Sequence, residues 1–136
     1  KDRGVLFDVG HGMGSFCFEV TKAMVDQGFY PNTISSDIHK YCIDGPAHDL
    51  LTTLSKFLSL GMPLYNVIEA ATKNAALALN RKSIGNLKVG SIGNAAILSL
   101  DSGYYKFLDV KGTHLIGNKK INMSAVILKG QWWHSK

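Results

Sequence analysis

Blocks of apolar residues alternate with polar segments along the first half of the chain, and their spacing predicts alternating strands and helices. Residues 5–9 form a short apolar run with one interior Asp, which is typical of a buried parallel strand. Residues 16–27 carry apolar side chains at helical spacing, and Ser15 before them can cap a helix that Gly28 ends. A second apolar run at residues 33–36 predicts the next strand.

The pattern changes at Ser83, where helices give way to short strands separated by glycines. Before this point, apolar positions at helical spacing predict helices over residues 50–60 and 63–71, and an Ala-rich stretch predicts a small helix over residues 74–79. Beyond it, apolar runs at residues 95–100, 104–110 and 125–128 predict a β meander. We therefore place a domain boundary near residue 82, between a first domain of residues 1–82 and a second of residues 83–136.

Polar residues that can do chemistry directly follow both predicted strands. Gly10-His11-Gly12 comes after the first strand, and Asp37 with His39 comes after the second. Because the parallel strands of a β/α barrel carry catalytic side chains at their carboxyl ends, this arrangement predicts an α/β fold with part of a TIM (β/α)8 barrel. Two strands cannot close such a barrel, so we expect the chain to be part of something larger. Asp8, inside the first strand, is expected to be held by hydrogen bonds.

The composition of the chain indicates a globular protein. Of its 136 residues, 46% are hydrophobic and 18% charged, which argues against a disordered chain. The basic residues behind the net charge of +5 are scattered rather than interleaved with aromatics, so we expect no nucleic-acid partner. No apolar run reaches the roughly 18 residues of a membrane span, so no membrane partner is expected. Two cysteines without CxxC spacing argue against a zinc knuckle and suit a reducing cytoplasm, where we place the protein.

Several segments together resemble the amidohydrolase superfamily, most closely its amidohydrolase/deacetylase group, which is related to dihydroorotases and D-aminoacylases. The resemblance rests on Gly-His-Gly after Phe-Asp-Val, on Ser-Ser-Asp-x-His, and on stretches at residues 53–64, 71–79 and 85–95. It covers nearly the whole chain to about residue 100. Ala75 and Asn94 depart from the Pro and Asp that are usual in the family, which bears on stability rather than on chemistry.

The resemblance implies the fold and activity of a larger enzyme. The two predicted strands would be the last two of a TIM barrel, followed by the C-terminal half of a small β-sandwich domain, so the chain would be the C-terminal third of the enzyme. The activity implied is metal-dependent hydrolysis of C–N bonds by a deacetylase or a dihydroorotase-like enzyme, with a small-molecule amide as substrate. One or two divalent metals, which we expect to be zinc, would be held chiefly by residues of strands that this chain lacks. Because Lys1 stands within four residues of a strand, we expect sequence upstream of it.

The resemblance also assigns roles to residues at the two strand ends. Asp37 would contact the metal and carry a proton from the attacking water to the leaving nitrogen. His11 and His39, together with Gly10 and Gly12, would bind the substrate. The structural alternatives are a capping role for Asp37, a backbone hydrogen bond for His11 and a tight turn for the glycines.

Other readings of the same residues remain open. Asp37, His11 and His39 could form a three-ligand metal site on their own. The chain could also be a catalytically inactive fragment, or a split subunit that associates with the missing N-terminal part of the barrel. Two strands would leave open edges, which favour such association and also a homo-oligomer. A small stand-alone β domain with a helical cap would leave the Gly-His-Gly and Ser-Asp-x-His segments unexplained.

Overall fold

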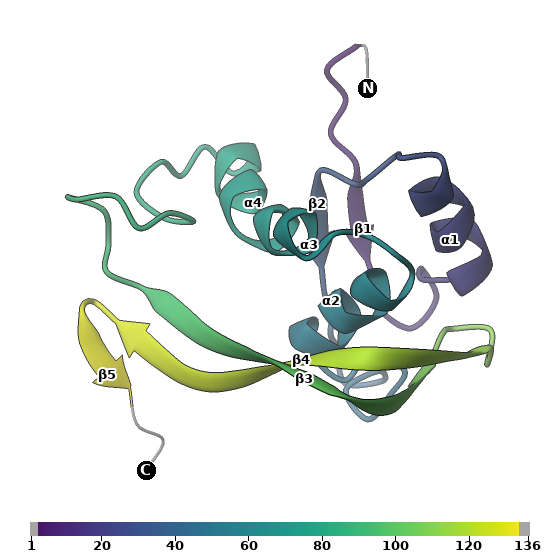
Figure 1. Cartoon of the computed structure of the whole chain (residues 1–136). Coiled ribbons are helices and arrows are strands. Elements are labelled where there is room, and N and C mark those ends of the chain that lie inside the picture. Colours follow the sequence, from purple (N-terminus) through teal and green to yellow (C-terminus); the bar gives the residue numbers. More distant parts are fainter. Residues whose placement is uncertain (1–2, 134–136) are drawn as a thin grey trace.

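The structure, a computed structural model, describes residues 3–133 and has an α/β fold (Figure 1). A parallel pair of short strands is surrounded by helices, and a long antiparallel hairpin runs beneath them. The elements in chain order are β1 (Asp8–Gly10), α1 (Phe18–Asp26), β2 (Thr33–Ser35), α2 (Leu50–Ser59), α3 (Leu64–Ala71), α4 (Lys73–Ala78), β3 (Ala95–Leu108), β4 (His114–Leu128) and β5 (Gln131–Trp133). The predicted order of strand, helix, strand and helices is therefore confirmed, and so is the change to strands in the second half.

The parallel pair β1–β2 separates an apolar face from a polar one. Val9 pairs with Ile34, and both side chains pack into the core with the helices. Since side chains alternate along a strand, the neighbouring residues face the other way. There the Asp8 carboxylate accepts hydrogen bonds from the hydroxyls of Thr33 and Ser35, each at 2.7 Å. The predicted hydrogen-bonding role of Asp8 is confirmed, although its side chain is exposed in this structure.

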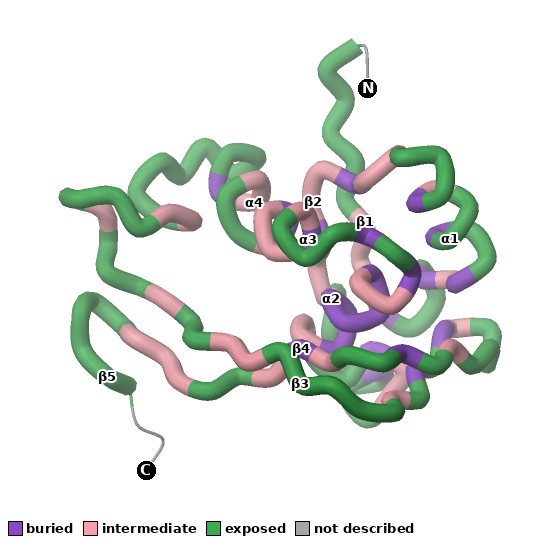
Figure 2. Tube along the Cα trace, viewed as in Figure 1, coloured by how far each residue is buried: buried purple, intermediate pink, exposed green. Residues whose placement is uncertain are grey.

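One hydrophobic core joins the helices to the hairpin. Figure 2 shows buried residues concentrated along α2 and where the hairpin crosses it. Phe57 of α2 is fully buried, and Phe107 of β3 and Ile121 of β4 belong to the same cluster. Gly117 of β4 lies so close to α2 that an added Cβ would overlap the hydroxyl of Ser59. The boundary near residue 82 stays a prediction, since this core continues across it.

The antiparallel sheet has the order β3–β4–β5 and differs in detail from the predicted meander. The runs predicted at 95–100 and 104–110 form the single strand β3, and Gly103 lies inside it rather than in a turn. A register irregularity between Ser102 and Tyr105 accommodates this glycine, so the pairing with β4 continues past it. Strand β4 begins at His114, far before the predicted run at 125–128, because polar residues on its exposed side mask the pattern. Half of a β-sandwich remains a prediction, since residues 3–133 contain one antiparallel sheet.

The start of α1 is fixed by a distant residue instead of by Ser15. Cys17 is the N-cap residue, and its side chain makes no capping hydrogen bond. The carboxylate of Asp109, after β3, accepts a hydrogen bond from the backbone N–H of Phe18 at 2.9 Å. It also accepts from the N–H groups of Lys111 and Thr113, at 2.9 and 2.8 Å. Burial alone would raise the pKa of Asp109, but these three bonds to its charged form outweigh burial and lower it.

No helix within residues 3–133 combines the length and the apolar character that a membrane crossing requires.

Candidate active site

The loops that follow β1 and β2 lie side by side, at the carboxyl ends of the parallel strands. The backbone N–H of Gly12 donates to the carbonyl of Ser36 at 3.0 Å, which extends the pairing beyond the strands. A Cβ added at Gly10 would lie 3.1 Å from the Cβ of Asp37. Three residues assigned to the site, Gly10, Gly12 and Asp37, are therefore brought together.

Asp37 holds a strained backbone conformation at the end of β2. Its φ of 49° lies in the left-handed region, which Asp tolerates better than most residues. The strand ends at Ser35, so this conformation turns the chain and leaves Asp37 exposed. Within residues 3–133, no hydrogen-bond donor or cation is bonded to its carboxylate. These oxygens are thus open to a ligand.

Gly12 leaves room for that carboxylate. Its φ is 47°, and a Cβ added there would overlap Oδ2 of Asp37 and lie 3.2 Å from its Cγ. The conformation favours glycine, and a Cβ at this position would displace the exposed Asp37 carboxylate from the place it occupies here. Gly14, two residues on, has open space at its Cβ position and an ordinary φ. The glycine at position 12 is explained by the close approach of Asp37 rather than by the turn alone.

His11 belongs to the same loop, but its side chain points into the core. The ring is fully buried and stacks on Phe16, with centroids 4.7 Å apart. Nδ1 lies 3.0 Å from the carbonyl oxygen of Gly12, and Nε2 lies 2.7 Å from Nζ of Lys56. Because a carbonyl can only accept, Nδ1 carries the proton and Nε2 accepts from the lysine. Burial lowers the pKa of His11, and the Lys56 charge lowers it further.

This placement fits the structural alternative for His11, a backbone hydrogen bond, and leaves its ring no nitrogen free for a substrate. The sequence could not distinguish the two orientations, because a histidine between two glycines can turn its ring either way. A substrate-facing role at this position would therefore fall to the backbone of the Gly10–His11–Gly12 segment.

His39 lies in the exposed loop after β2, two residues beyond Asp37. Since β2 ends before Asp37, the strand alternation that would have aligned the two side chains is lost. Nδ1 of His39 accepts from the backbone N–H of Tyr41 at 3.3 Å. The loop curls around the buried thiol of Cys42, whose Sγ lies 3.5 Å from the carbonyl of His39 and 3.7 Å from that of Asp37. The substrate-binding role of His39 stays a prediction.

Within the part of the chain that the structure describes, no three His, Cys, Asp or Glu side chains form a group that could hold a metal ion. The alternative of a self-contained site made by Asp37, His11 and His39 is therefore not realised in this fold. The reason is geometric: the buried His11 ring points into the core, while Nδ1 of His39 accepts a hydrogen bond from Tyr41 within the exposed loop after β2.

Lys56 is the residue of this region that sequence reasoning did not identify. It is fully buried in α2, and burial lowers its pKa to about 8. A lysine inside a helix usually marks the solvent-exposed face, and nothing local in the sequence signals otherwise. Its burial follows only from the packing of the hairpin against α2.

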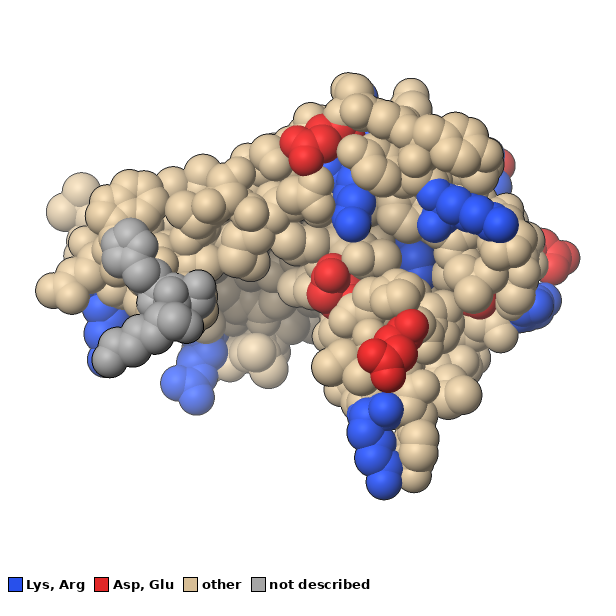
Figure 3. All heavy atoms as spheres, turned by 90° about the horizontal axis from the view of Figure 1, so that it is seen from below, with Lys and Arg blue, Asp and Glu red and all other residues tan. Residues whose placement is uncertain are grey.

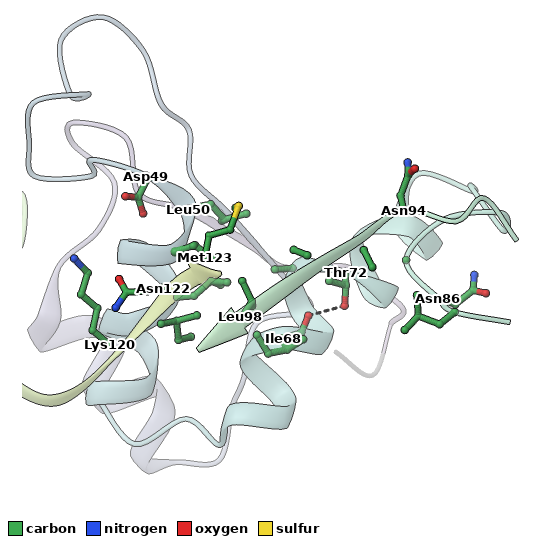
Figure 4. A pocket seen from close by; sticks show the side chains of 18 residues that line it. Asp49, Leu50, Ile68, Thr72, Asn86, Asn94, Leu98, Lys120, Asn122 and Met123 are labelled. Atoms are coloured by element: carbon green, nitrogen blue, oxygen red, sulfur yellow. Dashed lines mark hydrogen bonds between the residues drawn. The ribbon is translucent and has the colours of Figure 1, made fainter. Parts of the chain in front are cut away.

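A cavity of about 800 Å³ lies elsewhere, between α2, α3 and the hairpin (Figure 4). Apolar side chains such as Leu50, Leu98 and Met123 dominate its walls. Its lining includes Asp49, the N-cap residue of α2 at the end of the loop after β2, but neither Gly12 nor Asp37, so the cavity is distinct from the candidate active site. Figure 3 shows acidic and basic side chains interspersed on another face of the molecule, without a continuous basic stripe.

The sequence of the chain is similar to those of proteins named deacetylases. It is 38% identical to a deacetylase of Brucella anthropi and 37% identical to one of Agrobacterium fabrum, each over 110 residues. Each match covers 81% of this chain and 27% of the relative. A deacetylase of Enterococcus faecalis is 30% identical over 131 residues, which are 96% of this chain and 36% of the relative. No family model matches the chain.

Solved structures give the same picture. The crystal structure of an adenine deaminase superposes with a TM-score of 0.94 and 29% identity, covering 98% of this chain and 37% of that one. A dihydroorotase structure superposes with a TM-score of 0.89 and 31% identity, covering 95% and 34%. The chain thus spans about a quarter to a third of the length of the curated relatives it matches. These similarities confirm the resemblance to the amidohydrolase superfamily that the sequence motifs indicated, and the chain corresponds to a C-terminal part of a protein of that superfamily.

Proposed function

We propose that the protein to which this chain contributes hydrolyses a C–N bond of a small amide, and that Asp37 is its acid/base. One observation carries the proposal: the exposed carboxylate of Asp37 lies at the carboxyl end of β2, without an internal partner in the described residues, against a glycine that makes room for it. An unpartnered carboxylate at this edge is available to a ligand, unlike that of Asp8, which is bonded on the strand face.

The names of the relatives support the reaction class. Deacetylase and adenine deaminase denote enzymes that remove an acetyl and an amino group, and each removal breaks a bond at a carbonyl or a carbonyl-like carbon. We take deacetylation of an N-acylated small molecule, or the opening of a cyclic amide, as the candidate reactions for this protein.

The residues present could supply only part of the ligand set of a divalent metal. Asp37 offers one exposed carboxylate, a ligand type suited to zinc, while residues 3–133 hold no complete group of ligands. The remaining ligands would come from residues outside this chain. When bound, such an ion polarises the substrate carbonyl and lowers the pKa of water.

The chain's own contribution is proton transfer and shape. The Asp37 carboxylate takes a proton from the water that attacks the carbonyl carbon. It then returns this proton to the nitrogen as the C–N bond breaks, so that acid and amine leave with all protons accounted for. Gly10 and Gly12 keep the space beside the carboxylate free of side chains, which lets a substrate approach the backbone there.

The experiment measures hydrolysis by the assembled enzyme of N-acetylated amines, a cyclic amide and adenine, with Asp37→Asn as the variant. Removal of a general acid/base costs about 10²- to 10⁴-fold in rate, and we expect a loss in this range. Asp44→Asn is the matched control, because Asp44 is an exposed carboxylate of the same loop. Hydrolysis by Asp37→Asn at the rate of the control would exclude the assigned role.

A requirement for additional chain is the second proposal. In the described residues, β1 and β2 pair only with each other, and Val5, Leu6 and Met13 beside them are about half exposed. Unpaired edges and exposed apolar side chains favour association. We expect the isolated chain to hold no stoichiometric metal and to hydrolyse no amide, and to co-elute with a separately made N-terminal part of the barrel in size-exclusion chromatography. Turnover by the chain alone would exclude this requirement.

A further inference from the structure

A single buried ammonium group connects the two loops of the candidate site to each other and to the hairpin. Nζ of Lys56 donates to Nε2 of His11 at 2.7 Å, to the carbonyl of Pro46 at 2.6 Å and to the carbonyl of Leu108 at 2.8 Å. An ammonium has three N–H donors, and here each has one acceptor. The three acceptors come from the loop after β1, the loop after β2 and the end of β3.

The burial of this charge is costly, so its environment is informative. Lys56 is fully buried, and no carboxylate among residues 3–133 bonds to it; Asp109 and Asp49 act on it only from a distance. A charge out of contact with water and without an ion-pair partner is destabilising unless all its hydrogen bonds are made. A methionine would fill the same space without that cost, so packing alone does not explain a lysine here.

A continuous series of contacts leads from Lys56 to the face that receives Asp37. The lysine fixes the His11 ring, which also rests on Phe16. Nδ1 of His11 donates to the carbonyl of Gly12, while the N–H of Gly12 donates to Ser36. The N–H and the carbonyl of Gly12 are therefore both hydrogen-bonded, and the position that a Cβ would occupy lies against the Asp37 carboxylate. From the other direction, the bond to Pro46 anchors the loop that begins at Asp37.

We propose that Lys56 is a positioning residue of the active site, which holds the loops after β1 and β2 in register so that the Asp37 carboxylate stays against Gly12. As far as it concerns catalysis, this inference rests on the proposed function. Lys56 is bonded to His11, Pro46 and Leu108 rather than to Asp37, so its effect on the carboxylate passes through His11 and through the Pro46 carbonyl.

The decisive variant is Lys56→Met, which keeps the bulk of the side chain and removes its three donors. Ser55→Ala is the matched control. Ser55 is also fully buried in α2, and its hydroxyl donates to Leu51 and accepts from the N–H of Ile121, so it fastens the same helix to the hairpin without reaching either loop. Both variants lose buried hydrogen bonds at one interface, and only Lys56→Met loses those of the site.

The first readout needs no activity. Amide hydrogen exchange by NMR on the 136-residue chain reports the bond from Gly12 to Ser36. We expect the exchange rate of the Gly12 amide to be at least tenfold higher in Lys56→Met than in Ser55→Ala. The comparison is made where core amides, such as that of Val67, exchange at equal rates in the two variants. Lys56→Gln keeps amide N–H donors, so we expect its Gly12 exchange rate to lie between those of Lys56→Met and Ser55→Ala. This variant replaces Lys56→Met in the comparison if the methionine variant does not fold.

The second readout is kinetic and uses the assembled enzyme. A displacement of a catalytic group by about 1 Å costs about 10²-fold in rate, so Lys56→Met should lower kcat by about that factor with KM changed less than about threefold. Ser55→Ala should keep kcat within about twofold of the wild-type value, even if it lowers the melting temperature as much as Lys56→Met does.

The outcomes separate this inference from the proposed function. Equal exchange at Gly12 in Lys56→Met and Ser55→Ala would overturn the positioning role and leave Lys56 as a stabiliser of the helix–hairpin contact. If Gly12 exchange rises only in Lys56→Met, while wild-type enzyme hydrolyses none of the amides, the loop-holding role stands and the proposed function fails.

Discussion

Substitution of Gly12 by alanine tests the central geometric statement about the site, that Asp37 occupies the space beside this glycine. The new Cβ would overlap Oδ2 of Asp37 and lie 3.2 Å from its Cγ, so the carboxylate or the loop has to move. The backbone cannot easily adapt, because the N–H of Gly12 is bonded to Ser36 and its carbonyl to His11. The residue also has a φ of 47°, which disfavours any residue with a side chain.

The expected magnitudes follow from these two effects. Placing a Cβ in the left-handed conformation costs about 1–2 kcal/mol of folding free energy, which a folded domain can lose without unfolding. Removing the overlap requires a shift of about 1 Å of the Asp37 carboxylate, the proposed acid/base, and a shift of this size at a catalytic group costs about 10²-fold in rate. A hundredfold loss corresponds to about 3 kcal/mol in the activation free energy, so activity should suffer more than stability.

The assay compares Gly12→Ala with Gly14→Ala, using urea denaturation for stability and amide hydrolysis by the assembled enzyme for activity. Gly14 is the matched control, because it belongs to the same loop, has an ordinary φ and has open space where a Cβ would be added. We expect Gly14→Ala to change the free energy of unfolding by less than about 0.5 kcal/mol and to retain its activity. The reasoning would be refuted by Gly12→Ala hydrolysing amides as fast as Gly14→Ala, since Asp37 would then not act from the position seen here.

Further predictions concern the two buried ionic groups. Asp109→Ala leaves the buried N–H of Phe18 without an acceptor and should lower the free energy of unfolding by about 2–4 kcal/mol, measured by urea denaturation at neutral pH. Substitution of the exposed Asp101 by alanine should change it by less than about 0.5 kcal/mol, and equal effects of the two substitutions would contradict the capping role. Burial lowers the pKa of Lys56 from 10.5 to about 8, so between pH 8 and 10.5 the unfolded chain binds more protons than the folded one. The free energy of unfolding should therefore rise with pH in this range, by up to about 3 kcal/mol relative to Lys56→Met. A flat difference between the two proteins from pH 8 to 10 would show that the lysine pKa is not lowered by folding.

The sequence by itself determined the elements of the first half and their order. Helical spacing located α1 to α3 within a few residues, because each buries one apolar face, and an Ala-rich stretch located the short helix α4. It also singled out Asp37, Gly10 and Gly12, since polar residues and glycines directly after apolar strands are a local pattern. In the second half, the pattern divided β3 into two strands, found only the end of β4 and did not predict β5. Gly103 and Gly117 lie inside β3 and β4, where a local reading takes glycine as a turn.

Tertiary structure decided which way the polar side chains point and which of them are bonded. His11 faces inward because its partner Lys56 is 45 residues away in the sequence, and Asp109 caps a helix that begins 91 residues before it. No local pattern encodes such pairs, because a buried polar group is stable only where a distant acceptor or donor meets it. The candidate residues at the strand ends can thus be found from the local sequence, while the hydrogen bonds that hold their loops form only once helix α2, the two loops and the hairpin have packed together.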